Sequence, residues 1–358
     1  MKIEDKNILW LDLFDFLSYG KKIKLLSSIE RTEDLRKNFL SNAQIKSILT
    51  SEEFNKMALC LNESYLNNYL VEYEKDGVEL VTFNNPNYPY RLKEISTPPL
   101  CLYCKGDISL LNSECFAVVG TRGITDYGVV ATKQYCKALS EAGMTIVSGL
   151  AMGVDAVAHR SALENNGKTI AVLAGGFKHI YPATNYNLAR DILENNLLIC
   201  EYPPYVLPVA YNFPVRNRII AGLSKGVFVP EMGEKSGTMH TINYALEFNR
   251  DVFVLPGRIN SPASKGCNEL IKSLQGCITT SPDDILNAYN LKAKTANNTT
   301  QLDIEAQSVL NFIASEKHTF QEILEHTKMQ AQQLNTLLMT LELEGLLVKL
   351  ANNSYIMA

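Results

Sequence analysis

The first part of the chain carries apolar residues at spacings of three and four. Four segments show this pattern: LWLDLFDFL, KIKLLSSI, NAQIKSIL and SYLNNYLVEYEKDG. The spacing places apolar side chains on one face of a helix, and Gly77 follows the last segment where a helix-ending glycine belongs. We therefore expect an all-helical N-terminal domain over residues 1–78.

A different pattern follows, in which nearly continuous apolar runs alternate with stretches of helical spacing. After a short apolar piece, VELVTF, and a proline-rich lead-in come the runs FAVVG, MTIVSG, KTIAVLAGG, LLICEY, GVFVPE and DVFVLPG. Runs of this kind are typical of parallel strands buried on both faces. Residues 79–288 are thus predicted to form an α/β domain with a doubly wound, mostly parallel sheet.

The remaining residues divide into a linker and a small C-terminal domain. Residues 289–301 are polar and without apolar period, which predicts a linker. Beyond it, residues 302–358 show three helical segments, a glycine and two short strand-like pieces, as a winged-helix domain does. Gln330 to Glu344 would be the helix in the recognition position.

Composition narrows the class of protein. The chain has 358 residues, 46% hydrophobic and 20% charged, as an ordinary globular protein of two or three domains has. Its start, MKIEDKNILW, lacks a leader pattern, and no apolar run reaches the roughly 18 residues of a membrane span. Eight scattered cysteines suggest buried, reduced thiols. We therefore expect a cytoplasmic protein without membrane association.

Metal sites are not predicted. Cys101 and Cys104 form one CxxC without a second pair, and the five histidines lack ligand spacing. Asp155 and His159 lie four apart on a predicted helix, where we expect a structural hydrogen bond between them rather than a catalytic pair.

Charge is distributed unevenly along the chain. The formal net charge is −4, but residues 212–272 hold eight basic and five acidic residues, whereas 301–358 hold three and seven. A nucleic-acid site needs a basic footprint, so such a site is expected in the α/β domain.

Three turns after predicted strands are suited to anions. In open α/β sheets ligands bind at the carboxyl ends of strands, where backbone N–H groups and helix N-termini point outward. Glycine after a strand can also be no more than tight-turn geometry, so a single turn is weak evidence. Together the three predict a row of phosphate sites at Gly120-Thr121-Arg122, Ser148-Gly149 and Lys235-Ser236-Gly237-Thr238.

The segment NFPVRNRIIAGLS adds two arginines and an aromatic ring. Arg216 and Arg218 are spaced for two contacts to oxyanions, and Phe213 offers a flat face for a base. This combination favours single-stranded nucleic acid. A second interpretation is that the arginines pair with carboxylates of their own domain.

Standard nucleotide-binding motifs are absent. GTRGIT has Arg122 in place of the second glycine of GxGxxG, and the near match to a P-loop at Ala162–Thr169 leads from helix to strand, the wrong order. No bound cofactor is therefore expected.

The motifs together resemble a known family. VVGTRGITDYG, SGLAMGVDAVAH, GGFKHIYP, EYPP, NFPVRNRIIAGLS, EKSGTMHT and VFVLPGRINSPASKGCNELI are similar to the DNA-processing protein A family, also called DprA or Smf, over about residues 85–286. The resemblance implies a bacterial protein that binds incoming single-stranded DNA and loads the RecA recombinase during natural transformation. It also implies an extended Rossmann fold for residues 79–288, a SAM-like fold for the helical start, dimerisation through the Rossmann domain and no catalysis.

The family's motifs map onto individual residues of this chain. Its GSR turn falls on Gly120, Thr121 and Arg122. The remaining DNA-binding positions that the resemblance implies are Phe213, Arg216, Asn217, Arg218, Lys235, Ser236, Gly237 and Thr238. Two positions depart from the family pattern, Met152 in place of arginine and Tyr205 in place of glycine. The second departure puts the conformation of the loop after EYPP in question.

Two other functions stay open at this point. Nucleotide phosphoribohydrolases of related fold place a catalytic glutamate where this chain has Thr241, which removes the charge that would stabilise an oxocarbenium-like transition state. A winged-helix regulator of duplex DNA is the other alternative, but the predicted recognition helix has no Lys or Arg. Lys21, Lys22 and Lys24 in the helical domain are expected to be solvated.

Overall fold

The computed structural model describes residues 2–292, 304–314, 316–343, 346–350 and 353–357. It divides the chain into two compact units, Met1–Ala293 and Lys294–Ala358. Most of the predicted linker, from residue 293 to 301, lies outside the described residues.

The N-terminal part of the first unit is helical, as the periodicity predicts. Polar residues begin four of its helices by accepting backbone hydrogen bonds: Ser18, Asn42, Thr50 and Asn62. The chain leaves the last helix through Gly77, at a positive φ of 66°. The helices are α1 (Ile3–Asp12), α2 (Tyr19–Ser27), η1 (Thr32–Asp34), α3 (Leu35–Asn38), α4 (Ala43–Ile48), α5 (Ser51–Ala58) and α6 (Glu63–Lys75).

The helical part shares a hydrophobic core with the sheet. Trp10 and Phe39, from the helices, belong to the same buried cluster as Tyr103, Ala171 and Leu198, from the strands. Accordingly, the boundary predicted at residue 78 falls between α6 and β1 but does not divide the compact unit.

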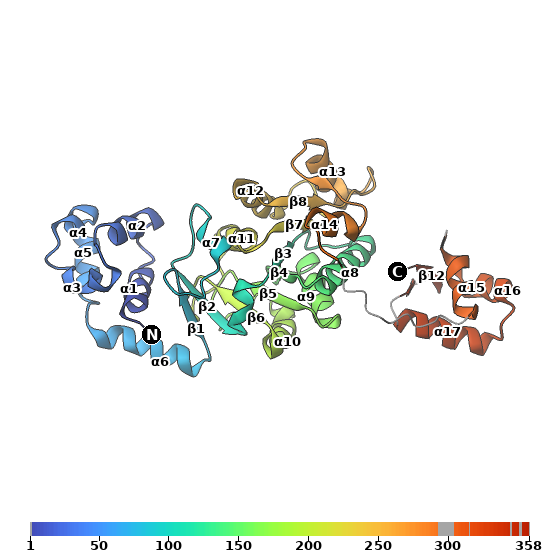
Figure 1. Ribbon diagram of the computed structural model, residues 1–358, viewed down its shortest axis with the longest axis horizontal. Coiled ribbons are helices and arrows are strands. Elements are labelled where there is room, and N and C mark those ends of the chain that lie inside the picture. The colour runs from blue at the N-terminus through green and yellow to red at the C-terminus, as the bar shows by residue number, and fades with distance from the viewer. Residues whose placement is uncertain (1, 293–303, 315, 344–345, 351–352, 358) are drawn as a thin grey trace. The chain divides into compact units, whose positions relative to one another are not determined.

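A nine-stranded sheet forms the centre of the first unit (Figure 1). The strands are β1 (Glu79–Thr82), β2 (Cys101–Gly106), β3 (Cys115–Val118), β4 (Thr145–Ser148), β5 (Lys168–Val172), β6 (Leu197–Cys200), β7 (Gly226–Val229), β8 (Asp251–Val254) and β9 (Cys277–Ile278). Their order is β1-β2-β6-β5-β4-β3-β7-β8-β9. The pairs β1–β2 and β2–β6 are antiparallel, and the others are parallel. The predicted doubly wound, mostly parallel sheet is confirmed, and strand order reverses between β3 and β7.

Helices cover both faces of the sheet because strand side chains alternate between two cores. Phe116 and Val118 of β3 pack with residues of α8 and α9, whereas Cys115 and Ala117 pack with residues of α11 and α12. The helices of this part are α7 (Tyr90–Lys93), η2 (Ile108–Asn112), α8 (Asp126–Glu141), α9 (Val154–Glu164), η3 (Ala183–Asn185), α10 (Tyr186–Asn195), α11 (Asn212–Leu223), α12 (Thr238–Glu247), η4 (Pro262–Ser264), α13 (Lys265–Lys272) and α14 (Pro282–Ala288).

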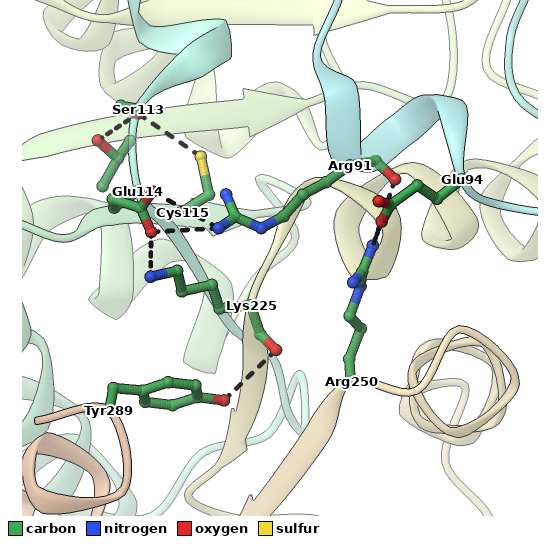
Figure 2. Close-up of polar contacts among 9 residues, drawn as sticks. Arg91, Glu94, Ser113, Glu114, Cys115, Lys225, Arg250 and Tyr289 are labelled. Carbon is green, nitrogen blue, oxygen red and sulfur yellow. Dashed lines mark hydrogen bonds and ion pairs between the residues drawn. The ribbon is translucent and has the colours of Figure 1, made fainter.

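A network of ion pairs fastens the proline-rich lead-in to the sheet (Figure 2). Arg91 of α7 lies 3.2 Å from the carboxylate of Glu114, which Lys225 also contacts. Arg250 lies 3.2 Å from Glu94 and donates to the Arg91 carbonyl. Glu114, Lys225 and Arg250 immediately precede β3, β7 and β8, so the network lies at the amino ends of these strands. The predicted phosphate turns lie at the opposite, carboxyl ends.

The second unit is a winged-helix domain. Its elements are α15 (Ile304–Ile313), β10 (His318–Thr319), α16 (Phe320–Thr327), α17 (Ala331–Leu343), β11 (Leu347–Lys349) and β12 (Ser354–Met357). The sheet order is β10-β12-β11, so the structure adds one short strand to the two that were predicted. Helix α17 occupies the predicted recognition position, and its side chains Leu334, Leu338 and Leu341 belong to the hydrophobic core of this domain.

Within the described residues, no helix has the length and apolarity that crossing a bilayer requires. In the same part of the chain, no group of three or more His, Cys, Asp or Glu side chains is arranged to hold a metal ion. The eight cysteines are free thiols, of which six are buried; Cys277 is exposed, contrary to the expectation that all are buried.

Candidate nucleic-acid interface

A cavity opens at the carboxyl end of the sheet, at the point between β3 and β7 where the strand order reverses, which we call the switch point. Its volume is about 730 Å³, and its walls come from the turns after β3 and β7, the start of α9, the N-terminal half of α11 and the N-terminus of α12. A site at this place is what open α/β sheets provide, because adjacent loops diverge there. Of the three predicted turns, those at Gly120 and Lys235 line the cavity, and the one at Ser148 does not.

The turn after β3 is held by backbone hydrogen bonds. The N–H of Thr121 donates to the carbonyl of Glu231 at 2.9 Å, and the N–H of Val154 donates to the carbonyl of Thr121 at 3.1 Å. Gly120 is required, because a Cβ there would lie 2.5 Å from the Val154 side chain and 2.7 Å from the Glu231 carbonyl. The turn therefore presents Arg122 from a fixed backbone.

Arg122 is exposed at the mouth of the cavity. Among the residues that the structure describes, no carboxylate lies within ion-pair distance of it. Its guanidinium lies 5.9 Å from the ring centroid of Phe213, and the ring of Tyr181 meets Phe213 edge-on at 5.5 Å. An arginine that has no acidic partner in the protein and lies against an aromatic ring can donate hydrogen bonds to a phosphate. The neighbouring rings can then stack on a base.

The turn before α12 completes the basic side of the cavity. Thr238 donates its hydroxyl hydrogen to the Gly120 carbonyl at 2.9 Å, which joins the two turns. Lys235 is exposed and, within the described part of the chain, has no acidic partner; the N–H of Gly237 likewise has no acceptor there. A Cβ on Gly237 would meet nothing within 4 Å, so a ligand can approach this helix N-terminus closely.

The turn at Ser148 and Gly149, predicted as a phosphate site, has its hydrogen-bond donors bound inside the protein. The Ser148 hydroxyl is buried and donates to the Val118 carbonyl at 2.7 Å. The N–H groups of Gly149 and Ala151 donate to the carboxylate of Asp155, at 3.1 and 3.3 Å. The turn does bind an anion, as its geometry indicates, but the anion is a carboxylate of the protein itself.

A second internal carboxylate occupies the N-terminus of α8. Glu231 is buried, and its oxygens accept hydrogen bonds from the N–H of Thr125 at 2.8 Å and from its hydroxyl at 2.7 Å. The N-terminus of α8 thus already holds an acid of the protein, whereas no acidic side chain caps the N-terminus of α12 in the described structure.

Arg216, predicted as a phosphate ligand, is buried and bound by backbone carbonyls of the protein. Its side chain lines the cavity wall but is only 4% exposed. The guanidinium donates to the Gly149 carbonyl at 2.8 Å and to the Val172 carbonyl, and it faces Asp155. Burial lowers the pKa of Arg216 to about 10, and the Asp155 carboxylate opposes that decrease. Arg216 therefore stays charged at neutral pH and holds the cavity floor together.

Arg218 faces away from the cavity. Residues 216 and 218 belong to α11, and two positions apart on a helix point to opposite sides. Arg218 is 6% exposed and pairs with Glu201. For this residue the second interpretation, pairing within its own domain, is the correct one. Asn217 lies between them, lines the cavity and accepts a hydrogen bond from Arg216 at 3.1 Å.

Some functional residues were not singled out from the sequence. Asp155 was noted only for its spacing to His159, yet it organises the floor of the cavity. His159 bonds Thr169 at 2.7 Å rather than Asp155, so the expected pairing was wrong, although its role is structural. Tyr181, within the motif GGFKHIYP, could not be found from the sequence, because a single exposed tyrosine in a loop gives no local signal of its partner Phe213.

Two family models match this chain. One is described as DNA recombination-mediator protein A and matches residues 79–290; the other is described as the DprA winged helix domain and matches residues 293–353. This chain belongs to the DNA recombination-mediator protein A family.

Curated relatives match somewhat more than half of this family member. The DNA processing protein DprA of Bacillus subtilis is 41% identical over 204 residues, which cover 57% of this chain and 69% of that protein. Protein Smf of Escherichia coli is 44% identical over 215 residues, which cover 60% of this chain and 57% of that protein. The chain thus matches little more than half the length of the E. coli relative.

Two solved structures of the family are similar to this one. The X-ray structure of DNA processing protein A from Streptococcus pneumoniae has a TM-score of 0.70 at 34% identity, covering 80% of this chain and 98% of that chain. DNA processing protein A from Helicobacter pylori has a TM-score of 0.54 at 33% identity, covering 59% and 96%. The H. pylori structure is described as giving insights into a single-stranded DNA binding mode.

Proposed function

We propose that this protein binds single-stranded DNA in the cavity at the switch point, without marked sequence preference. The observation that carries the proposal is the constellation of Arg122 on Phe213 beside Lys235 and the open N-terminus of α12. Phosphates are bound by the two exposed cations and the helix N-terminus, and a base lies against the aromatic pair of Phe213 and Tyr181. Every base has a π-face, so such a site tolerates any sequence.

A single strand suits this cavity better than a duplex. Bases of a duplex are stacked and paired, so their faces are not offered to Phe213 without melting. In a single strand the faces are free, and stacking on an aromatic side chain contributes about 1–3 kcal/mol per base. The H. pylori relative, described with single-stranded DNA, supports the same ligand class.

Membership of the family supports a more specific role. We propose that the bound strand is handed to the RecA recombinase during natural transformation in the bacterial cytoplasm, and that the protein acts as a homodimer through its Rossmann domain. The rate at which purified RecA assembles on single strands, with and without this protein, tests the loading, with Arg122→Ala as the control. Light scattering of the full-length chain tests the dimer.

We also propose that the protein is not an enzyme. Thr241, at the position of the phosphoribohydrolase glutamate, lines the cavity with a hydroxyl. Asp155 is the acidic residue in the described lining, and it is held by Gly149, Ala151 and Arg216. A carboxylate that is already bound by two N–H groups and faces a guanidinium is poorly suited to act as a general base or to stabilise an oxocarbenium ion.

The duplex-regulator alternative receives little support from the second unit. Helix α17 has no Lys or Arg, and residues 301–358 carry a formal charge of −4. Duplex binding derives most of its affinity from cations that neutralise phosphates, so this unit is poorly suited to it.

A fluorescence anisotropy titration tests the proposed ligand. Single-stranded, duplex and mononucleotide probes would be titrated at two salt concentrations. We expect the single strand to bind most tightly and to weaken steeply with salt, because released counterions supply the affinity. Preference for duplex, salt-independent binding, or tighter binding of the mononucleotide would contradict the proposal.

A further inference from the structure

The segment from Tyr202 to Phe213, YPPYVLPVAYNF, carries no charged residue. Alternate side chains along it are exposed, with exposed fractions of 41% at Tyr205, 59% at Leu207, 52% at Val209 and 76% at Tyr211. We call these four residues the apolar stripe. Exposed contiguous apolar surface is costly in water and commonly marks a binding site.

The apolar stripe is fixed beside the mouth of the cavity. Between its members, Pro208 and Ala210 line the cavity wall. The N–H of Gly176 donates to the Val206 carbonyl at 2.8 Å, and the N–H of Lys178 donates to the Pro204 carbonyl at 2.9 Å, which ties the segment to the loop after β5. The stripe therefore continues the cavity wall outward from Phe213.

Tyr205 occupies its place without strain, although the family pattern has glycine there. Its φ is not among the positive values of the described backbone, so the loop takes a conformation open to any residue. Its ring lies 6.3 Å from that of Tyr69 on α6. The departure from the family pattern thus adds an aromatic ring to the exposed side of the loop.

The apolar stripe itself carries no charge, and a net negative charge lies beside its Tyr205 end. Glu201 pairs with Arg218, whereas Glu72 and Asp76 share the single cation Lys178. Glu72 and Asp15 both lie close enough to act on Tyr205, so phosphates approach that end less favourably than the Tyr211 end. The stripe can therefore offer its side chains to bases but makes no phosphate contact, and it is continuous with a cavity that holds Phe213.

We propose that the bases of a single strand leaving the cavity stack along the apolar stripe, from Tyr211 toward Tyr205. The inference rests on the proposed function of the cavity and extends the path of the strand beyond it. Phosphate contacts are made at Arg122 and Lys235, whereas the stripe contributes stacking and no charge.

The test compares Tyr211→Ala with Tyr211→Phe, because Tyr211 makes no hydrogen bond within the described structure and the ring is what stacks. Anisotropy would be measured with a short oligonucleotide that fills the cavity and with a long one. We expect Tyr211→Ala to weaken the long strand about 5- to 100-fold while the short one binds unchanged, and Tyr211→Phe to restore binding. The exposed Leu59→Ala is the matched control and should bind both like the parent.

Salt dependence separates this inference from the proposed function. Arg122→Ala should weaken both lengths and reduce the salt slope by about 0.7 for each lost phosphate contact, whereas Tyr211→Ala should leave the slope unchanged. If Arg122→Ala has no effect, the proposed function fails. If Arg122→Ala weakens binding but Tyr211→Ala leaves both lengths unchanged, the stacking path is overturned while the cavity site stands. Weaker capture of RecA by Tyr211→Ala with unchanged DNA affinity would assign the stripe to a protein partner and overturn the inference.

Discussion

At the scale of single residues, the site separates cations that are available to a ligand from cations that hold the fold. Arg122 and Lys235 are exposed and, within the described structure, lack acidic partners. Arg216 and Arg218 are buried and bound internally. Both groups contain arginine, so residue type alone does not tell them apart.

Replacing Arg122 by lysine should weaken single-strand binding. Lysine keeps the charge but loses the planar fork and the contact with Phe213, and we expect a loss of about 1 kcal/mol in binding free energy, against about 1.5–3 kcal/mol for Arg122→Ala. Anisotropy at fixed salt measures both, with the exposed Arg190→Lys as control. Parent-like binding of Arg122→Lys would mean that the contact is a point charge.

Replacing Arg216 by alanine should destabilise the protein rather than remove a phosphate contact. The change leaves the buried Asp155 carboxylate without its guanidinium, which should reduce the free energy of unfolding by about 3–5 kcal/mol. Urea denaturation measures the loss, and Arg122→Ala should stay within about 0.5 kcal/mol of the parent. An Arg216→Ala protein that is fully stable but binds DNA poorly would restore the direct contact that the sequence predicts.

At the scale of elements, two glycines in neighbouring turns have different functions. Gly120 is closely surrounded, whereas Gly237 at the start of α12 faces open space. We expect Gly120→Ala to lower the free energy of unfolding by about 1–3 kcal/mol, since overpacking displaces its neighbours. Gly237→Ala should keep the stability and weaken DNA binding by about 1 kcal/mol, because a methyl group blocks approach to a charged hydrogen bond. Equal effects on folding would contradict this division.

The contact between α9 and β5 should make stability depend on pH. His159 is buried against Thr169, and burial, with Arg216 nearby, lowers its pKa from 6.5 to about 3. A lowered pKa means that the unfolded chain binds the proton more readily than the folded protein does. The contribution of neutral His159 to the free energy of unfolding is therefore complete above pH 6.5 and is lost as pH falls toward 3. The slope from this residue should be about 1.4 kcal/mol per pH unit.

Urea denaturation of the parent and of His159→Asn between pH 7 and 4 measures this slope. Burial raises the pKa of Asp12 to about 6, so this residue makes the free energy of unfolding increase as pH falls from 6 toward the ordinary pKa of the carboxyl group. Because that change opposes the effect of His159, the comparison should be repeated in Asp12→Asn. Identical pH profiles with and without His159 would contradict the assignment.

At the scale of the whole molecule, binding is expected to belong to the first compact unit. Cutting the chain near Asn297 removes the acidic unit, which supplies few cations for phosphates, and should change single-strand affinity by no more than about threefold. Anisotropy on both fragments checks this. Loss of binding by the truncated protein, with binding retained by residues 301–358, would move the function to the winged helix.

The sequence alone determined the helical start, the alternation of strands and helices and their order along the chain, whereas β2, β9 and the order of strands within the sheet came from the structure. Alternating apolar runs and helical periods require a parallel sheet with helices on both faces, because those side chains have no other way to leave water. The same rule placed the turns at Gly120 and Lys235 on one edge, since parallel strands end together. These inferences depend on short-range spacing, which is visible in the sequence.

Tertiary structure decided which groups remain available to a ligand. The turn at Gly149 binds Asp155, six residues further on, and Arg216 reaches the carbonyl of Val172, 44 residues away. Whether a buried charge has a partner depends on what lies next to it in space, and a turn that can hold a phosphate can equally hold an internal carboxylate. The roles of Arg216, Arg218 and Ser148 were therefore fixed by packing, whereas Arg122 remained available because no acid folds back onto it in the described structure.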